Sequence, residues 1–323
     1  MINSDFEANL INFETDIKNY IENFSSENIY VRTYSDESLL EMARHSKNER
    51  DIYYKLLAHN YILVSHNGRR SRFSRLNTFQ SLDPKLLRYE NILYKLEAPL
   101  KKLVSPNEKN RLVVVMPGWG NDFSDSSNVL ERTFASYFPD LQQNILGNTT
   151  ILRIADFNLS HGSFYLNTEL SQNIESNIQA LIKNVRTANN VDTDAVVMLG
   201  IQNGGLGAIY HGLLQEEYAV IAVTPIIDSS RDEHDPKKTS FQVPFRELDY
   251  TSTINKLVDE IRKENNNILI IDNSTGSPTY EEKKKLTNKI KFHDLNNPLA
   301  DTVLKISQVS RSFVITRINL FLS

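Results

Sequence analysis

Cysteine is absent from the 323-residue sequence, and tryptophan occurs only once. The absence of cysteine excludes disulfide bonds, thiolate metal sites and cysteine nucleophiles, and it fits a reducing compartment. The stretch RDEHDP at 231–236 combines one histidine with acidic residues but lacks a metal-ligand spacing. We interpret it as a solvated loop, and we expect neither a metal site nor a cofactor.

An excess of basic charge and long apolar runs are absent as well. The chain has 36 basic and 40 acidic residues, a formal net charge of -4, so no overall positive field favours a nucleic-acid partner. No segment approaches the roughly 18 consecutive apolar residues of a membrane helix. The opening residues, MINSDFEANL, lack the basic-then-apolar order of a signal peptide. We therefore expect a cytoplasmic protein, and attachment to the inner membrane face through a partner stays open.

Residues 1–105 are predicted to form an N-terminal α+β region. Apolar residues at steps of three and four predict a helix over 6–24 that packs on the rest of the protein. They are Phe6, Leu10, Phe13, Ile17, Tyr20 and Phe24. A short strand near 29–34 and more helix through residue 59 are expected to follow.

The end of this region is marked by a polar, turn-like stretch at 105–110, SPNEKN. Before it, Asp83-Pro84 suits a helix start, and residues 61–65 and 91–97 suit strands. These strands either belong to a separate domain or lead the main sheet as antiparallel strands.

Residues 106–323 alternate between apolar runs and helical stretches. The runs that predict buried strands are RLVVVM at 111–116, then 151–155, 195–199, 219–223 and 268–271, and a more polar run at 289–295. The helical stretches are about 126–137, 168–187, 204–215, 251–264, 279–287 and 299–311. Strands that are apolar throughout and alternate with helices indicate an α/β fold with a doubly wound, mostly parallel sheet covered on both faces.

The stretch VVMLGIQNGGLGAIYHG at 197–213 predicts a strand, a sharp turn and a helix. In hydrolases such a corner reads G-x-S-x-G, with serine as the nucleophile. Here Gln202 holds the serine position, between Gly200 and Gly204. The two glycines leave the room that a strained residue at the tip requires. The spacing does not match G-x-G-x-x-G, which argues against a nicotinamide site.

The order of these loops resembles the α/β-hydrolase fold, in which an oxyanion loop follows strand three, the nucleophile strand five, an acid strand seven and a histidine strand eight. More narrowly, three stretches resemble capsular polysaccharide biosynthesis proteins of the XcbB/CpsF type. They are VVVMPGWGN, LRIADFNLSHGSFYLNTE and LGIQNGGLGAIYHG. A more distant similarity is to the hydrolase-like protein of the accessory secretion system. The resemblance covers about residues 60 to 310 and implies a sugar or polysaccharide ligand and capsule-assembly partners.

Carried over by position, this resemblance implies a degenerate serine triad. The nucleophile position falls on Gln202, the acid on Asp272 and the histidine on Ala300. A primary amide cannot form an acyl-enzyme as serine does. His293 would serve as the base only if it lay at the carboxyl end of its strand, and a histidine at the sheet edge is the favoured interpretation. We therefore expect binding or support of assembly rather than ester hydrolysis, as in a pseudoenzyme.

The oxyanion loop is expected to be intact, because Gly118 and Gly120 allow backbone N–H groups to approach a ligand oxygen and Asn203 N–H would be the second donor. Trp119 would either stack on a sugar ring or plug the pocket. The predicted substrate-binding residues are Gly118, Trp119, Gly120, Asn121, Asp156, His161, Ser163 and Asn203.

Two other function classes stay open. One is an active acyltransferase or hydrolase on a sugar polymer, with Asp156, His161 or Asp272 as the acid–base group and Ser163 as an alternative nucleophile. The other is a non-catalytic interaction protein that docks through its N-terminal region. His211 is expected to pack in the elbow helix.

A short arginine-rich stretch, HNGRRSRFSR at 66–75, is the last feature. Guanidinium groups fit phosphate or carboxylate groups. The stretch therefore predicts either a docking site for an anionic ligand or an ordinary surface turn.

Overall fold

The structure is a computed structural model. It describes residues 10–11, 26–76, 85–119, 125–215, 217–227, 241, 245, 250–260, 265–275, 280–284, 286 and 290–323. The predicted helix start at Asp83-Pro84, the loop at 231–236, and most of the helix predicted over 6–24 lie outside these residues. The described part of that helix, β1 (Leu10–Ile11), is instead a short strand that pairs with β2. The helix prediction is therefore wrong at these two positions.

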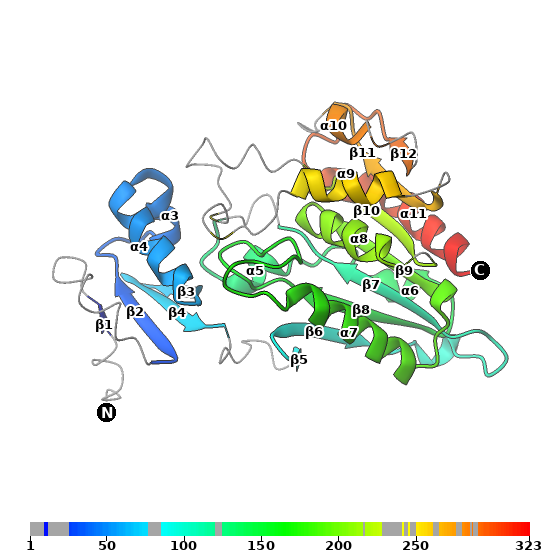
Figure 1. Ribbon diagram of the computed structural model, residues 1–323, viewed down its shortest axis with the longest axis horizontal. Helices are drawn as coiled ribbons and strands as arrows, with labels where there is room; N and C mark the ends of the chain where they lie inside the picture. The colour runs from blue at the N-terminus through cyan, green and yellow to red at the C-terminus, as the bar shows by residue number, and fades with distance from the viewer. Residues whose placement is uncertain are drawn as a thin grey trace.

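An N-terminal lobe is built on a four-stranded sheet in the order β1-β2-β4-β3. Its further elements are β2 (Asn28–Arg32), α3 (Leu39–His45), α4 (Lys47–Ala58), β3 (Tyr61–Asn67) and β4 (Arg70–Arg75). Ser38 starts α3 with a reciprocal capping box to Glu41. The two helices cover one face of the sheet (Figure 1), where Ile29, Val31 and Phe73 are at most 1% exposed.

The main sheet has eight strands in the order β12-β11-β10-β9-β7-β8-β6-β5. They are β5 (Leu87–Tyr89), β6 (Ile92–Glu97), β7 (Arg111–Met116), β8 (Thr149–Ala155), β9 (Val196–Ile201), β10 (Ala219–Val223), β11 (Asn265–Asp272) and β12 (Ile290–Asp294). The strands β7 to β12 pair in parallel, whereas β6 is antiparallel to β8 and to β5. In chain order, with β5 as the first strand of this sheet, the third, fifth, seventh and eighth strands are β7, β9, β11 and β12.

Helices cover both faces of this sheet (Figure 1). They are α5 (Val129–Thr133), α6 (Leu141–Asn144), α7 (Ile174–Ala188), α8 (Asn203–Leu213), α9 (Tyr250–Glu260), α10 (Tyr280–Lys284) and α11 (Val303–Leu322). One apolar core joins the sheet to α7, α8 and α9, and a second joins its other face to α6 and α11. The predicted doubly wound α/β fold of hydrolase type is therefore confirmed. The helix α5 is shorter, and α11 longer, than the sequence predicts.

The two segments that suit strands before residue 105 belong to different sheets. The segment at 91–97 forms β6, which together with β5 leads the main sheet, whereas the segment at 61–65 lies in β3 of the N-terminal lobe. A domain boundary near residue 105 stays a prediction.

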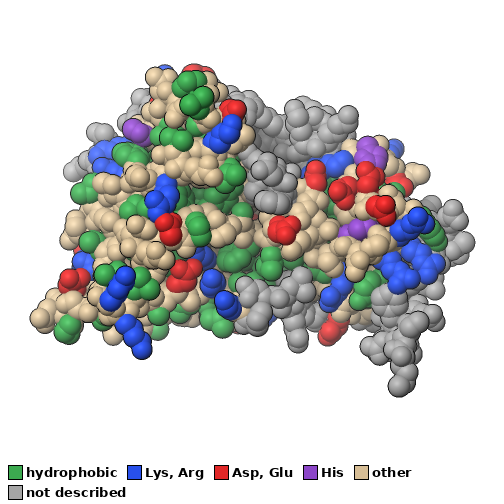
Figure 2. Space-filling view, turned by 180° about the vertical axis from the view of Figure 1, so that it is seen from behind, with side chains coloured by type: hydrophobic (Ala, Val, Ile, Leu, Met, Phe, Trp, Pro, Cys, Tyr) green, Lys and Arg blue, Asp and Glu red, His purple; other side chains and the backbone are tan. Residues whose placement is uncertain are grey.

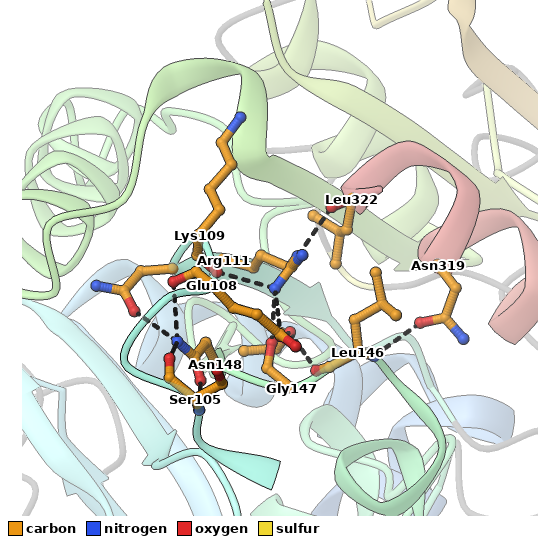
Figure 3. Close-up of polar contacts among 11 residues, drawn as sticks. Ser105, Glu108, Lys109, Arg111, Leu146, Gly147, Asn148, Asn319 and Leu322 are labelled. Carbon is orange, nitrogen blue, oxygen red and sulfur yellow. Dashed lines mark hydrogen bonds and ion pairs between the residues drawn. The ribbon is translucent and has the colours of Figure 1, made fainter.

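At the amino ends of the strands, Arg111 ties three chain segments together (Figure 3). Its guanidinium donates to the carbonyls of Leu322 at 2.8 Å, Lys109 at 2.8 Å and Gly147 at 2.9 Å. Asn148 closes the neighbouring loop by donating to Ser105 O at 2.7 Å. Arg111 is 8% exposed. The network therefore closes the sheet at the amino ends of its strands.

The N-terminal lobe is joined to the body by Arg132 of α5, whose side chain is fully buried. Its guanidinium donates to Leu63 O of β3 at 2.6 Å, to Ser160 O at 2.7 Å and to Ser126 O. Tyr53 of α4 adds a hydrogen bond of 2.7 Å to the hydroxyl of Ser160. The lobe therefore contacts the loop that follows β8.

Candidate functional site

Gln202 forms the tip of a sharp turn between β9 and α8. Its backbone has φ 51° and ψ −119°, a region that non-glycine residues rarely adopt. The turn closes because its neighbours are glycines: a Cβ on Gly200 would lie 2.0 Å from Gly204 O, and one on Gly204 would lie 2.0 Å from Met116 O. The sequence thus folds into the strained corner of a hydrolase elbow, with an amide in place of the hydroxyl.

The carboxyl ends of β9, β10 and β11 lie side by side at one end of the parallel strands. Gln202 N donates to Val223 O at 3.0 Å, and Thr224 N donates to Ile271 O at 2.8 Å. These bonds extend the parallel ladders by one step beyond the strands. Gln202 and Thr224, which follow β9 and β10, and Asp272, the last residue of β11, therefore lie at the carboxyl ends of neighbouring strands, where a parallel sheet binds its ligands.

Asp272, to which the resemblance assigns the acid position, forms a buried ion pair. Asp272 is 0% exposed, and its Oδ2 lies 2.6 Å from Nζ of Lys283, which is 2% exposed. The other oxygen accepts the N–H of Asn273 at 2.9 Å. Lys283 of α10 thus binds one oxygen of Asp272. In a serine triad that carboxylate would orient the histidine. The local sequence does not mark Lys283 as a site residue, because Lys283 stands in a run of lysines that is typical of a solvated helix.

Ala300, to which the resemblance assigns the histidine position, is 0% exposed and packs in the same apolar core as α11. Its carbonyl accepts from Asn273 Nδ2 at 2.6 Å. The same amide group donates to Asn297 O and accepts from Asn297 N, both at 2.9 Å. Asn273 therefore fixes the loop after β12, where this fold would carry its base.

His293 lies within β12 rather than in the loop beyond it. It is in register with Ile271, which is in register with Val223 and, through that residue, with Ile201 next to the elbow. Three strand spacings amount to about 14 Å. The imidazole stacks on Phe313 of α11, with the ring centroids 4.2 Å apart. His293 thus lies within the edge strand and about three strand spacings from the elbow, and its catalytic role stays a prediction.

The loop after β7 packs directly on the elbow. A Cβ on Gly118 would lie 2.3 Å from Ile201 O and 2.8 Å from the Cβ of Gln202, so only glycine fits. The next residue, Trp119, donates its backbone N–H to Asn203 Oδ1 at 3.2 Å. An N–H of this loop, of the kind that would stabilise an oxyanion, is therefore held by a side chain of the protein. Gly120 and Asn121 lie outside the described residues.

Trp119 is anchored at both of its polar ends. Its indole N–H donates to His161 O, and its carbonyl accepts from the hydroxyl of Tyr137. Its ring is half-buried and meets Phe164 edge to face at 5.8 Å. These contacts favour a packing role over a freely stacking platform.

Asp156 organises the loop that follows β8. Its carboxylate accepts from Ser163 N at 2.7 Å, Tyr165 N at 2.9 Å and Asn158 Nδ2 at 3.0 Å, and the Ser163 hydroxyl lies 3.3 Å away. A Cβ on Gly162, which has φ 84°, would lie 2.6 Å from Asp156 Oδ2. Burial raises the pKa of Asp156, and these hydrogen bonds oppose the rise. Asp156 and Ser163 thus bond to each other and hold the loop.

His161 faces the N-terminal lobe. It is 1% exposed, and its Nε2 lies 3.4 Å from an Arg44 nitrogen of α3. Its ring is parallel to that of Phe241 at 6.1 Å. Arg44 in turn pairs with Asp125 at 2.7 Å. His161 therefore contacts Arg44 and an aromatic ring at the N-terminal lobe. The carboxylate of Asp156 accepts from the backbone of its own loop rather than from His161.

His211 is buried in α8, as expected of a packing residue. Its Nδ1 lies 2.9 Å from the Gln179 amide nitrogen, and its Nε2 lies 2.9 Å from Tyr165 O. The amide must donate to Nδ1, so Nε2 carries the proton and donates to the carbonyl. Burial lowers the pKa of His211 to about 4, which keeps the ring neutral.

The part of the chain that the structure describes contains neither a metal-ligand cluster nor a helix that could span a membrane. There, no three or more His, Asp or Glu side chains gather as a metal site would require. The helices of the same part include none with the length and hydropathy needed to span a bilayer.

Comparisons with known proteins bear on the fold. No protein-family model matches the sequence, and no curated protein does either. The capsule O-acetyltransferase of Neisseria meningitidis serogroup A superposes with a TM-score of 0.51 and 14% identity, over 75% of this chain and 98% of that chain. This chain therefore has an α/β-hydrolase-like fold.

Two further structures align less well. The S-formylglutathione hydrolase FrmB of Staphylococcus aureus gives a TM-score of 0.48 and 14% identity, over 72% of this chain and 93% of that chain. The glycosylation-associated Gap123 complex of Streptococcus agalactiae gives a TM-score of 0.48 and 19% identity, over 76% of this chain and 50% of that chain.

Proposed function

We propose that this protein serves capsular polysaccharide or related glycan assembly as a binding protein, without serine-triad hydrolysis. The observation that carries the proposal is the content of the triad positions. They hold Gln202, an Asp272 paired with Lys283, and Ala300. A cytoplasmic location, a polysaccharide ligand, capsule-assembly partners and kinship with the XcbB/CpsF type are parts of the same proposal.

The chemistry of these residues opposes covalent catalysis at the elbow. Gln202 offers no ionisable proton near neutral pH, and it is 5% exposed. No imidazole follows β12 to act as the general base, since residues 295–302 contain no histidine. In addition, Asn203 Oδ1 occupies the N–H of Trp119 that an oxyanion would need. Each change alone would slow acyl transfer, and together they remove its nucleophile, its base and one of its donors.

The glycan assignment rests on two supports. The first is the shared fold with a capsule O-acetyltransferase. The second is the resemblance of the strand-end loops to capsule biosynthesis proteins, which includes DFNLSHGSFYLNTE at 156–169. In the structure this second stretch forms the loop that Asp156 fixes, next to Trp119.

The test is ester turnover and covalent labelling of the full chain. The wild type and Gln202→Ala are assayed with p-nitrophenyl acetate and with a fluorophosphonate probe, beside an active serine esterase as positive control. We expect no labelling and no turnover above buffer for either form. Turnover that Gln202→Ala abolishes would overturn the proposal. Gln202→Ser tests the same point in reverse: we expect it to stay inactive, because the base is still missing.

A further inference from the structure

The loop between β8 and α7 is strained where it passes between the N-terminal lobe and the elbow. We call residues 157–165 of this loop the β8 loop. Its residues with a positive φ include three that are not glycine: Leu159 at 57°, Phe164 at 60° and Tyr165 at 64°. Bulky side chains rarely adopt this region, and such a conformation persists only where the surroundings impose it. The contacts of the β8 loop therefore show what holds the strain.

The N-terminal lobe holds successive residues of the β8 loop. Leu159 is 6% exposed and packs in the apolar core of the lobe. The hydroxyl of Ser160 lies 2.7 Å from the hydroxyl of Tyr53 in α4. His161 Nε2 lies 3.4 Å from a nitrogen of Arg44 in α3. The position of this part of the loop therefore depends on where the lobe packs.

The body of the protein holds the other part of the β8 loop. The carboxylate of Asp156 accepts from the backbone N–H groups of Ser163 and Tyr165, at 2.7 and 2.9 Å. The strained backbone is thus fixed between two anchors that belong to different parts of the fold. On the outer surface of the lobe, by contrast, charged side chains of both signs gather (Figure 2).

The β8 loop in turn holds Trp119. The carbonyl of His161 accepts the indole N–H of Trp119. The rings of His161 and Phe164 meet the indole edge to face, with centroids 5.6 and 5.8 Å away. The backbone N–H of Trp119 donates to Asn203 Oδ1 at 3.2 Å, next to the tip of the elbow. A movement of the β8 loop would therefore reach the elbow through one residue.

A ligand oxygen at the elbow competes with Asn203 for the N–H of Trp119. The present acceptor is the neutral amide oxygen of Asn203. Hydrogen bonds to an ionised acceptor are roughly twice as strong as neutral ones, so an anionic ligand can displace the amide. Such an exchange requires Trp119 to adjust, and its indole is held by the β8 loop.

From these contacts we infer that the N-terminal lobe acts as a clamp on the elbow. It keeps the strained β8 loop closed on Trp119, and it thereby keeps the N–H of Trp119 on Asn203. When the contacts of Tyr53 and Arg44 loosen, the β8 loop relaxes and the N–H becomes available to a ligand. The coupling is reciprocal, so a ligand that takes this N–H weakens the packing of the lobe. The inference rests on the proposed binding role and adds its regulation.

The test uses Trp119, which is the sole tryptophan of the chain and gives a single indole signal in a nitrogen–proton NMR spectrum. Hydrogen exchange of its indole N–H and backbone N–H is measured in the full chain without a ligand. Tyr53→Phe with Arg44→Met removes two contacts between the lobe and the β8 loop. Exchange of both N–H groups should become at least about tenfold faster. Tyr53→Phe alone is the milder variant and should speed exchange by at least about threefold.

The matched control is Tyr61→Phe with Arg72→Met. These side chains form hydrogen bonds to Ser26 and Asn28 inside the lobe. The control should change the exchange rates of Trp119 by less than about twofold. Unchanged exchange in the first pair of variants, or equal acceleration in the control, would overturn the inference. An equal acceleration at the amides of β9 would do so too, because the contacts would then stabilise the fold as a whole.

Access of a ligand to the elbow is tested with inorganic phosphate. Phosphate should shift the backbone signal of Trp119 at a concentration at least about threefold lower in Tyr53→Phe with Arg44→Met than in the wild type. Equal concentrations, or no shift in either protein, would contradict the clamp. Ester turnover and probe labelling are measured separately, so the clamp can fail while the proposed function stands, and the reverse also holds.

Discussion

Gln202 and Thr224 end adjacent parallel strands, and both have a positive φ, 51° and 45°. The N–H of Gln202 donates to the carbonyl of Val223, the residue before Thr224, at 3.0 Å. Positive φ is uncommon outside glycine and is an outlier for a β-branched residue. Strain of this kind persists where the surroundings over-determine it, and it clusters at functional sites. The turn between β9 and α8 is thus strained at a position that carries an amide side chain.

The strain at Gln202 can be measured with two substitutions. Gln202→Gly and Gln202→Ala both remove the side chain, but only glycine adopts the observed backbone at no steric cost. We expect the glycine variant to be more stable than the alanine variant by about 1 kcal/mol. Urea unfolding of both proteins checks this. Equal stabilities would mean that the turn relaxes to an ordinary conformation.

The hydroxyl of Thr224 gives a second prediction. It is buried and has no hydrogen-bond partner among the described residues. Valine has the same shape and the same branching at Cβ, so Thr224→Val removes the polar group and leaves the backbone demand as it is. We expect a gain in unfolding free energy of about 1 kcal/mol. Thermal and urea unfolding should agree, and a loss of stability would show that the hydroxyl has a partner.

The ion pair of Asp272 and Lys283 is expected to show strong coupling. Asp272→Leu or Lys283→Met alone leaves one buried charge uncompensated, which costs about 3–5 kcal/mol. Asp272→Leu with Lys283→Met removes both charges and should recover most of that loss. A double-mutant cycle measured by urea unfolding provides the coupling energy. Additive losses would contradict the buried pair.

His211 predicts a pH dependence of stability. Its pKa falls from 6.5 to about 4 on folding, so the unfolded chain takes up a proton at a higher pH than the folded chain does. The stabilisation is complete above pH 6.5, is lost as the pH falls toward 4, and amounts to about 3 kcal/mol. His211→Gln keeps an N–H for Tyr165 O and has no proton to gain. The difference in unfolding free energy between the two proteins should therefore change across this pH range, and a constant difference would contradict the prediction.

Arg111 is predicted to stabilise the edge of the sheet far from the elbow (Figure 3). Arg111→Met leaves three carbonyl acceptors without their donor, which should cost about 2–3 kcal/mol. Arg88→Met, at an exposed position of β5, is the matched control and should change stability by less than about 0.5 kcal/mol. A similar effect of both variants on the urea midpoint would contradict a special role for Arg111.

The sequence predicts the buried strands well because each is a continuous apolar run between polar turns, as in RLVVVM at 111–116. The helix α11 extends past the predicted end at 311 because Val314, Ile318 and Leu322 keep one face apolar at steps of four. Local pattern determines both results.

The contacts of the candidate site are harder to predict, because they join residues far apart in the chain. Lys283 reaches back across a loop to Asp272, and Arg44 meets His161 across 117 positions. Nothing in the local sequence distinguishes these side chains from solvated ones. The elbow could be placed because its glycines mark a local backbone requirement, whereas the partners of its neighbours depend on the complete fold.

The buried guanidinium of Arg132 bears on how the protein unfolds. Among the described residues it donates hydrogen bonds to three carbonyls, those of Leu63 in the N-terminal lobe, Ser126 before α5 and Ser160 in the loop after β8. Detaching the lobe would take away Leu63 O and leave a cation in a partly dry cavity, at a cost of several kcal/mol. We therefore expect the lobe and the body to melt in a single cooperative transition, so that the unit of folding is larger than either sheet alone.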